Sequence, residues 1–132
     1  MKLRCGMLRG KMALGICCFL LVLSVAACGN KDFVGNSYKL GNSITIEFQV
    51  LNRTETEEID LKSGDTVDFI VASQSGQLDI EFGLKDARPD YKGNSVETGS
   101  FTVTVHQDGR YILTVTGSNA KGSVKLIKEE QK

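Results

Sequence analysis

Apolar and polar residues alternate along most of the chain after residue 42. Successive side chains of a β-strand point to opposite faces, so a period of two predicts strands that bury one face. Seven segments show this period. Their apolar positions are Ile44, Ile46, Phe48 and Val50; Ile59 and Leu61; Val67, Phe69 and Val71; Leu78, Ile80, Phe82 and Leu84; Phe101, Val103 and Val105; Tyr111, Leu113 and Val115; and Val124 and Leu126.

Turn-forming residues separate several of these segments: Ser63-Gly64-Asp65, Ser75-Gly76, Asp108-Gly109 and Gly117-Ser118-Asn119. Glycine, asparagine, aspartate and serine favour tight turns, and no stretch after residue 28 has helical spacing with caps. Short alternating strands with frequent turns predict an all-β fold, an antiparallel β-sandwich of seven to eight strands that is jelly-roll-like and spans residues 43–128. The Asp108-Gly109 step predicts a hairpin between residues 101–106 and 110–116.

The first 27 residues have a different pattern. Lys2, Arg4, Arg9 and Lys11 precede an uncharged, almost wholly apolar run over residues 12–27. As a helix this run would span about 24 Å, which is short of the ~30 Å hydrocarbon core of a membrane. Basic residues, a short apolar run and small residues at its end predict a secretory signal peptide over residues 1–27.

The end of this segment, Val25-Ala26-Ala27-Cys28-Gly29, resembles a bacterial lipobox. The resemblance implies that Cys28 becomes the N-terminus and carries a lipid, which anchors the protein at the extracytoplasmic face of the cell membrane. A plain signal peptide or an uncleaved N-terminal helix is the alternative. The other three cysteines lie in the signal peptide, so the mature domain has no disulfide.

Residues 28–42 follow as a predicted flexible tether, rich in glycine and asparagine. Phe33, Val34 and Tyr38 leave open a short edge strand within it. Residues 129–132 are charged and are expected to fray.

Charge narrows the choice of partners. After residue 28 the chain has 12 basic and 16 acidic residues, a net charge of about −4, and no run of clustered lysine or arginine. Nucleic-acid binding requires such clusters to neutralise phosphates, so a nucleic-acid partner is not expected.

No set of residues in the mature chain resembles a catalytic site. His106 is the only histidine, and zinc or nucleophilic chemistry needs partners that the chain lacks. Asp79 and Glu81 lie about 7 Å apart on one strand face, which fits a solvated sheet face better than a glycosidase pair. Asp79, Asp86 and Asp90 are a candidate calcium set. We expect no enzyme activity and no cofactor.

The longest segment between predicted strands, residues 85–100, holds the only proline, Pro89. Long loops in compact domains are often functional, although a polar crossover between two sheets has the same composition. A possible contact surface here comprises Asp86, Arg88, Asp90, Tyr91 and Lys92.

The runs IDLKSGDTVDFIV, QLDIEFGLKD, SFTVTVHQDGRYILTVTG and GSVKLI occur in this order. They resemble the bacterial pre-peptidase C-terminal domain and similar GOLD-type sandwiches. The resemblance implies a non-catalytic binding or accessory module, but no peptidase is attached. The sequence thus predicts a surface lipoprotein that binds a protein or envelope polymer; the alternative is a small-ligand or carbohydrate-binding lipoprotein associated with a transporter.

Overall fold

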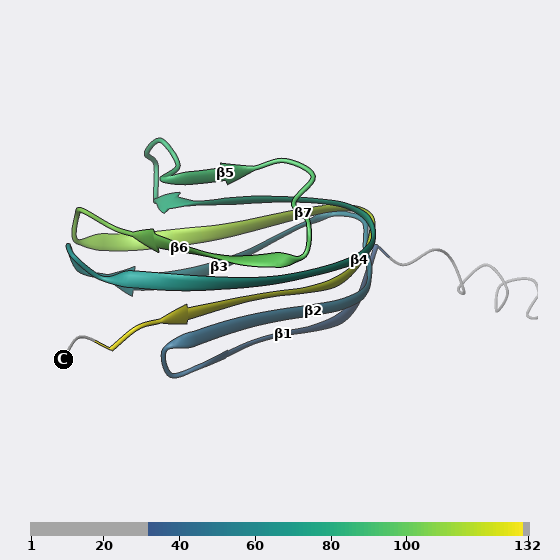
Figure 1. Ribbon diagram of the computed structural model, residues 1–132, viewed down its shortest axis with the longest axis horizontal. Helices are drawn as coiled ribbons and strands as arrows, with labels where there is room; N and C mark the ends of the chain where they lie inside the picture. The colour runs from purple at the N-terminus through teal and green to yellow at the C-terminus, as the bar shows by residue number, and fades with distance from the viewer. Residues whose placement is uncertain (1–31, 131–132) are drawn as a thin grey trace, which may run out of the picture. The chain divides into compact units, whose positions relative to one another are not determined.

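The computed structural model describes residues 32–130, so the signal peptide predicted over residues 1–27 and the lipidation predicted at Cys28 lie outside the described residues. The described chain is all-β, as predicted, and no helix in it is long and apolar enough to cross a membrane. Its strands are all paired antiparallel (Figure 1): β1 (Phe33–Leu40), β2 (Ser43–Leu51), β3 (Thr54–Leu61), β4 (Thr66–Leu84), β5 (Tyr91–Gly93), β6 (Gly99–Thr104) and β7 (Gly109–Lys128).

The two long strands β4 and β7 build the sandwich. They pair with each other along almost their whole length, and both turn over at the same end of the molecule (Figure 1). One half of each strand therefore lies in each layer. Layer A has the order β1-β2-β7-β4-β6 and uses the C-terminal half of β7 and the N-terminal half of β4; layer B has the order β3-β7-β4-β5 and uses the other halves.

The paired strands β4 and β7 bend at residues that the sequence predicted as turns. The register between β4 and β7 shifts between Ser73 and Gln77, and Gly76 has a φ of 75°. A Cβ on Gly76 would lie 2.1 Å from the backbone oxygen of Asn119, so only glycine fits this close approach. The turn residues therefore bend continuous strands here, where the sequence predicted that they separate one strand from the next.

The core lies between the layers and is made mostly of the predicted inward positions; Leu51 and Ala120 also belong to it, whereas Val50 does not. Phe69 and Phe82 are fully buried and pack edge to face, with ring centroids 5.2 Å apart. Tyr111 stacks on Phe82 and donates a hydrogen bond from its hydroxyl to the carbonyl oxygen of Gln107 at 2.7 Å. Burial raises the pKa of Tyr111 above its usual value.

The predicted tether is wrong from residue 33 onwards, and its alternative, an edge strand, is confirmed. β1 pairs with β2 from Phe33↔Leu51 to Leu40↔Ser43, so the sandwich begins ten residues before the predicted boundary at residue 43. The backbone pairing overrides the glycine and asparagine content, because Phe33 adds its ring to the core. At the other end, just after β7, the amide of Glu129 donates to the carbonyl of Thr66 at 2.9 Å.

The hairpin predicted at Asp108-Gly109 is also wrong. β6 pairs with β4 in layer A, whereas residues 109–116 of β7 pair with β3 and β4 in layer B. Val105 is fully buried and exchanges backbone hydrogen bonds with the β3–β4 turn, accepting from Gly64 and donating to Asp65. The chain therefore crosses between the layers after β6, and Val105 is buried where it crosses.

Candidate binding surface

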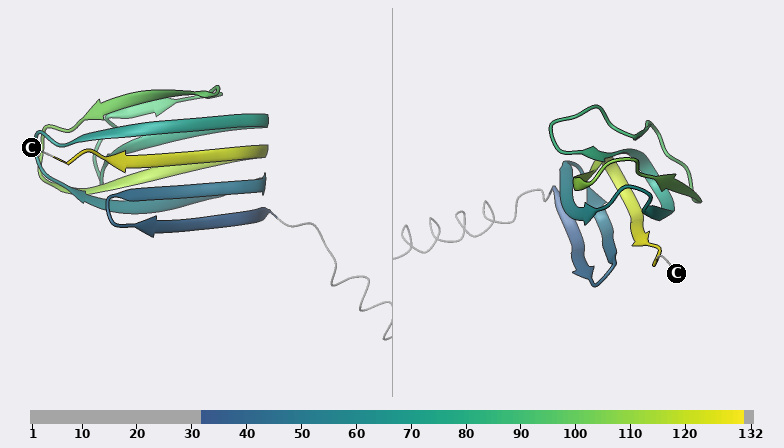
Figure 2. Two further views of the ribbon diagram at one scale, coloured as in Figure 1. Left: turned by 60° about the horizontal axis from the view of Figure 1, so that its bottom comes forward. Right: turned by 90° about the vertical axis from the view of Figure 1, so that its left-hand side faces the viewer.

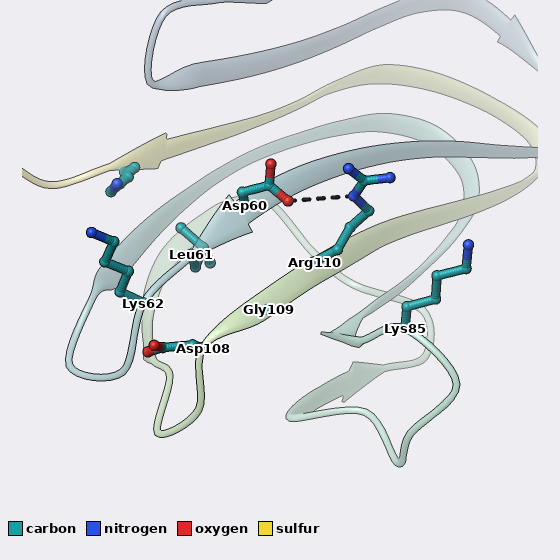
Figure 3. A pocket seen from close by; sticks show the side chains of 8 residues that line it. Asp60, Leu61, Lys62, Lys85, Asp108, Gly109 and Arg110 are labelled. Carbon is teal, nitrogen blue, oxygen red and sulfur yellow. Dashed lines mark hydrogen bonds and ion pairs between the residues drawn. The ribbon is translucent and has the colours of Figure 1, made fainter.

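An open hollow of about 620 Å³ lies at the end of the sandwich opposite the bend (Figure 3). We call it the end depression. Four separate parts of the chain line it: the end of β3 and the turn after it, the start of the 85–90 loop, the start of β7, and the end of β7. Its residues are Asp60, Leu61, Lys62, Lys85, Asp108, Gly109, Arg110 and Lys128.

Four cations and two aspartates belong to this lining. Two acids beside it, Glu58 and Asp65, pair with Arg110 and Lys128. Arg110 is held on the outer face of layer B, where its guanidinium forms an ion pair with Asp60 at 3.3 Å (Figure 3). It forms a second ion pair with Glu58 at 3.5 Å. Lys62 and Lys85 form no ion pair within residues 32–130. Both side chains are exposed and can therefore meet an incoming anion.

The side chain of Asp65 stabilises one wall of the end depression, the part formed by Lys62 and Lys128. Its buried carboxylate accepts a hydrogen bond from the backbone amide of Lys62 at 2.8 Å and lies 3.4 Å from the ammonium group of Lys128. The amide hydrogen bond, followed by the charge of Lys128, lowers the pKa of Asp65 although burial opposes this. Asp65 thereby holds Lys62 and Lys128 on the same side of the depression.

The connection between β6 and β7 is also held by a hydrogen bond from a backbone amide to an aspartate. The carboxylate of Asp108 accepts a hydrogen bond from the backbone amide of Ser63 at 2.7 Å, and the amide of Lys85 donates to the carbonyl of Arg110 at 2.9 Å. These contacts join three connections that are distant in sequence. The end depression therefore has a wall built by hydrogen bonds between turns.

The predicted contact loop is partly folded back onto the sandwich. Tyr91 is half-buried and stacks on Phe101 with ring centroids 4.2 Å apart, so it contributes to the core rather than to a contact surface. Lys92 forms an ion pair with Glu81 at 3.4 Å, and the amide of Asp90 donates to the carbonyl of Phe82 at 2.8 Å. The exposed side chains left from the prediction are Asp86, Arg88, Asp90 and Lys92.

The structure does not bring the candidate calcium set together. Residues 32–130 contain no group of three or more His, Cys, Asp and Glu side chains that could hold a metal ion. Asp79 accepts a hydrogen bond from the amide of Ser95 at 2.8 Å, whereas Asp86 and Asp90 lie in the exposed loop. Asp79 thus holds the β5–β6 connection, and His106 is exposed.

Sequence reasoning missed the end depression. Lys62, Lys85, Arg110 and Lys128 are each separated by about 20 residues in the sequence, so no run of basic residues indicates the cluster. The usable signal is that each of the four lies at one end of a predicted strand. With the strand pairing known, that position alone places them at the same end of the sandwich.

No protein-family model and no curated protein matches the chain. Solved β-sandwich modules are similar to it in fold. The pre-peptidase C-terminal domain of a Bacillus anthracis collagenase is 16% identical with a TM-score of 0.48, over 76% of this chain and 100% of that chain. The Aeromonas hydrophila periplasmic inhibitor of g-type lysozyme is 17% identical with a TM-score of 0.46, over 72% and 88%. Similarity at this level does not indicate a ligand.

Proposed function

We propose that this chain is a non-catalytic binding module, anchored by a lipid on Cys28 at the extracytoplasmic face of the membrane, that holds an anionic group of a protein or envelope polymer in its end depression. The lipobox-like sequence Val25-Ala26-Ala27-Cys28-Gly29 supports the anchor. The β-sandwich and its charged end depression support the binding role. The partner is defined by its chemistry: it presents carboxylate or phosphate groups to lysine and arginine.

The observation that carries the binding role is the presence of two exposed lysines, Lys62 and Lys85, in the lining of the end depression. Lys62 and Lys85 have no ion-pair partner within the described part of the chain, whereas Arg110 has two. A carboxylate or phosphate can pair with the two lysines without breaking an existing ion pair. The cost of desolvation at this open site is small, because the side chains stay partly hydrated.

The surface favours this contact over a sugar cleft. Carbohydrate sites place aromatic rings in a groove, but the aromatic side chains here point mostly into the core. Among the linings of five depressions on residues 32–130, Phe82 is the only aromatic residue.

The anchor is tested by Cys28→Ala in the full-length chain. We expect the wild type to fractionate with membranes and to begin at a lipid-modified Cys28 by mass spectrometry. The variant should accumulate unprocessed or leave the lipid-anchored fraction. A wild-type N-terminus upstream of Cys28, or an unmodified Cys28, contradicts the anchor and leaves the binding role untouched.

The binding role is tested by photo-crosslinking in intact cells. A photoreactive residue at Ser63, beside the end depression, should give a crosslinked product that a photoreactive residue at Ser118, at the bend end, does not give. The double substitution Lys62→Glu/Lys85→Glu should remove the Ser63 product, and Lys121→Glu, an exposed lysine elsewhere, should keep it. Retention of the product in the double variant contradicts the role of these lysines.

A further inference from the structure

Strand β1 forms the outer edge of layer A, with β2 on one side and no strand of residues 32–130 on the other (Figure 2). Seven of its eight residues are exposed. Phe33 packs on the core, so alternation turns Val34, Tyr38 and Leu40 to the outer face of the layer. These three are 37%, 43% and 67% exposed and make up three of the four exposed large hydrophobic residues in the described chain.

The free backbone groups of β1 can be assigned from its turn. Leu40 and Ser43 flank the two-residue loop Gly41-Asn42, in which Gly41 has a φ of 55°. Such a loop is flanked by a hydrogen-bonded pair, and hydrogen-bonded and non-hydrogen-bonded pairs then alternate along the hairpin. The even-numbered residues 36, 38 and 40 therefore bond to β2, and Gly35, Ser37 and Lys39 point their N–H and C=O groups at the open edge.

Charge distinguishes β1 from the edge strand of equal length in layer B. β3 contains Glu55, Glu57, Glu58 and Asp60 within eight residues. Like charges placed opposite one another destabilise a strand pair, so β3 opposes pairing with a copy of itself. β1 contains one charged residue, Lys39, and no acid. It lacks the protection that β3 has.

We propose that β1 pairs antiparallel with β1 of a second copy of this chain, centred on Ser37. In this register Gly35, Ser37 and Lys39 use their free backbone groups, with Lys39 opposite Gly35 of the second copy. Leu40 lies opposite Val34 of the second copy on the outer face, so the most exposed apolar side chain is covered by another. The two Lys39 residues lie four residues apart, about 14 Å, which is beyond the Debye length of about 8 Å at physiological ionic strength.

The pairing makes layer A continuous through both copies and leaves the end depression open, because the depression belongs to the ends of β3, β4 and β7. It does not depend on the lipid anchor. Both sandwiches keep their own core, since β1 stays bonded to β2 in each copy. The interface is the backbone ladder together with the apolar contacts of Val34, Tyr38 and Leu40.

Cysteine crosslinking of the full-length protein in membranes of the producing cells tests the proposal. Ser37→Cys places two thiols opposite each other across the two-fold axis, at a Cα separation near 5.5 Å that permits a disulfide. We expect an oxidised dimer whose crosslink maps to position 37 by peptide mass spectrometry. Thr56→Cys, on the other edge strand, is the matched control and should give none. No dimer from position 37, or equal dimer from position 56, overturns the proposal.

Proline gives a second, independent readout. Ser37→Pro removes an N–H that points at the open edge, and proline is tolerated where a strand N–H faces solvent. In detergent, the full-length wild type should sediment as a dimer and Ser37→Pro as a monomer, a rise of at least tenfold in the dimer dissociation constant. Ser37→Ala keeps the N–H and should remain a dimer. A wild type that is monomeric at every concentration, or a dimeric Ser37→Pro, overturns the proposal.

Discussion

The two long sides of the sandwich are closed in opposite ways. On the side of β5 and β6, rings fill the gap between the layers. Phe101 stacks between Phe69, at a centroid distance of 4.7 Å, and Tyr91, at 4.2 Å. We call this the aromatic edge; Figure 2 shows β5 and β6 together on one side and β1 on the other.

On the side of β1 and β3, exposed polar groups join the layers, and we call this the polar edge. The hydroxyl of Ser37 donates to the carboxylate of Glu57 at 2.6 Å, and the ammonium group of Lys39 donates to the carbonyl of Glu58 at 2.6 Å. Arg53 pairs with Glu55 and lies over the ring of Phe33, 5.0 Å from its centroid. Phe33 is the one half-buried aromatic residue here within the described chain.

The difference indicates which side holds the fold closed. Stacked rings contribute about 0.5–1.5 kcal/mol per pair beyond the area that they bury. Exposed ion pairs contribute about 0–1 kcal/mol and weaken with salt. The two layers should therefore stay in contact at the aromatic edge and separate first at the polar edge. A side that opens easily is compatible with β1 pairing to a second copy.

The largest expected effect comes from removing one ring at each edge. Phe101→Ala removes the ring that stacks on both Phe69 and Tyr91 and leaves a cavity beside Phe69. We therefore expect a loss of about 2–4 kcal/mol in the free energy of unfolding. Phe33→Ala, at a half-buried aromatic position of the other edge, should cost about 1 kcal/mol, because the polar edge gives its ring fewer neighbours. Denaturant unfolding measures both.

Phe101→Leu serves as the control, since it keeps most of the apolar volume and should recover over half of the loss. Equal losses for Phe101→Ala and Phe33→Ala would show that the two edges close the sandwich with similar strength.

A second prediction compares a buried carboxylate with a carboxylate at the polar edge. Each accepts a hydrogen bond, so a difference in stability cost reports the effect of burial. Asp65 is 4% exposed and accepts from the amide of Lys62, whereas Glu57 lies at the polar edge and accepts from Ser37. Asp65→Asn should cost about 1.5–3 kcal/mol, the usual range for a hydrogen bond to a charged group. Glu57→Gln should change stability by less than about 0.5 kcal/mol.

The pH dependence gives this prediction a sign. The pKa of Asp65 in the folded chain lies below its ordinary value of 3.8. Its contribution is therefore fully present above pH 3.8 and is lost as the pH falls through the lower, folded pKa. Acid titration of unfolding should show this loss in the wild type and in Glu57→Gln but a shallower one in Asp65→Asn. Equal slopes for all three proteins would contradict the assignment to Asp65.

The sequence was sufficient for the core and for the layer architecture. The period of two placed Ile44, Phe69, Ile80 and Leu113 inside, and all four are fully buried. Val50 was an exception, because an irregularity between Phe48 and Leu51 turns Leu51 inward instead. Alternation is a local property of the backbone, so it survives whatever strand pairing the chain adopts.

Which strands pair depends on contacts between residues that are distant in the sequence, and the sequence pattern did not predict these contacts. Asp108-Gly109 carries good turn residues, yet the burial of Val105 and its hydrogen bonds to the β3–β4 turn take β6 and β7 into different layers. The end depression was missed for the same reason. Lys62 and Lys128 are 66 residues apart and meet only because β3 and β7 end together.

The smallest expected effect concerns how often each edge opens. At concentrations low enough to keep the chain monomeric, amides of Asn36, Tyr38 and Leu40, which bond to β2, should exchange with deuterium faster than the amides of β6, because the contacts that close the polar edge are exposed. Raising the salt from 0.1 to 1 M shortens the Debye length from about 10 to 3 Å. Exchange in β1 should then rise severalfold while β6 stays unchanged, because stacked rings carry no charge to screen. Arg53→Ala should raise β1 exchange at low salt and abolish most of the salt response. A β6 response as large as that of β1 would mean that charge, and not ring stacking, closes both sides.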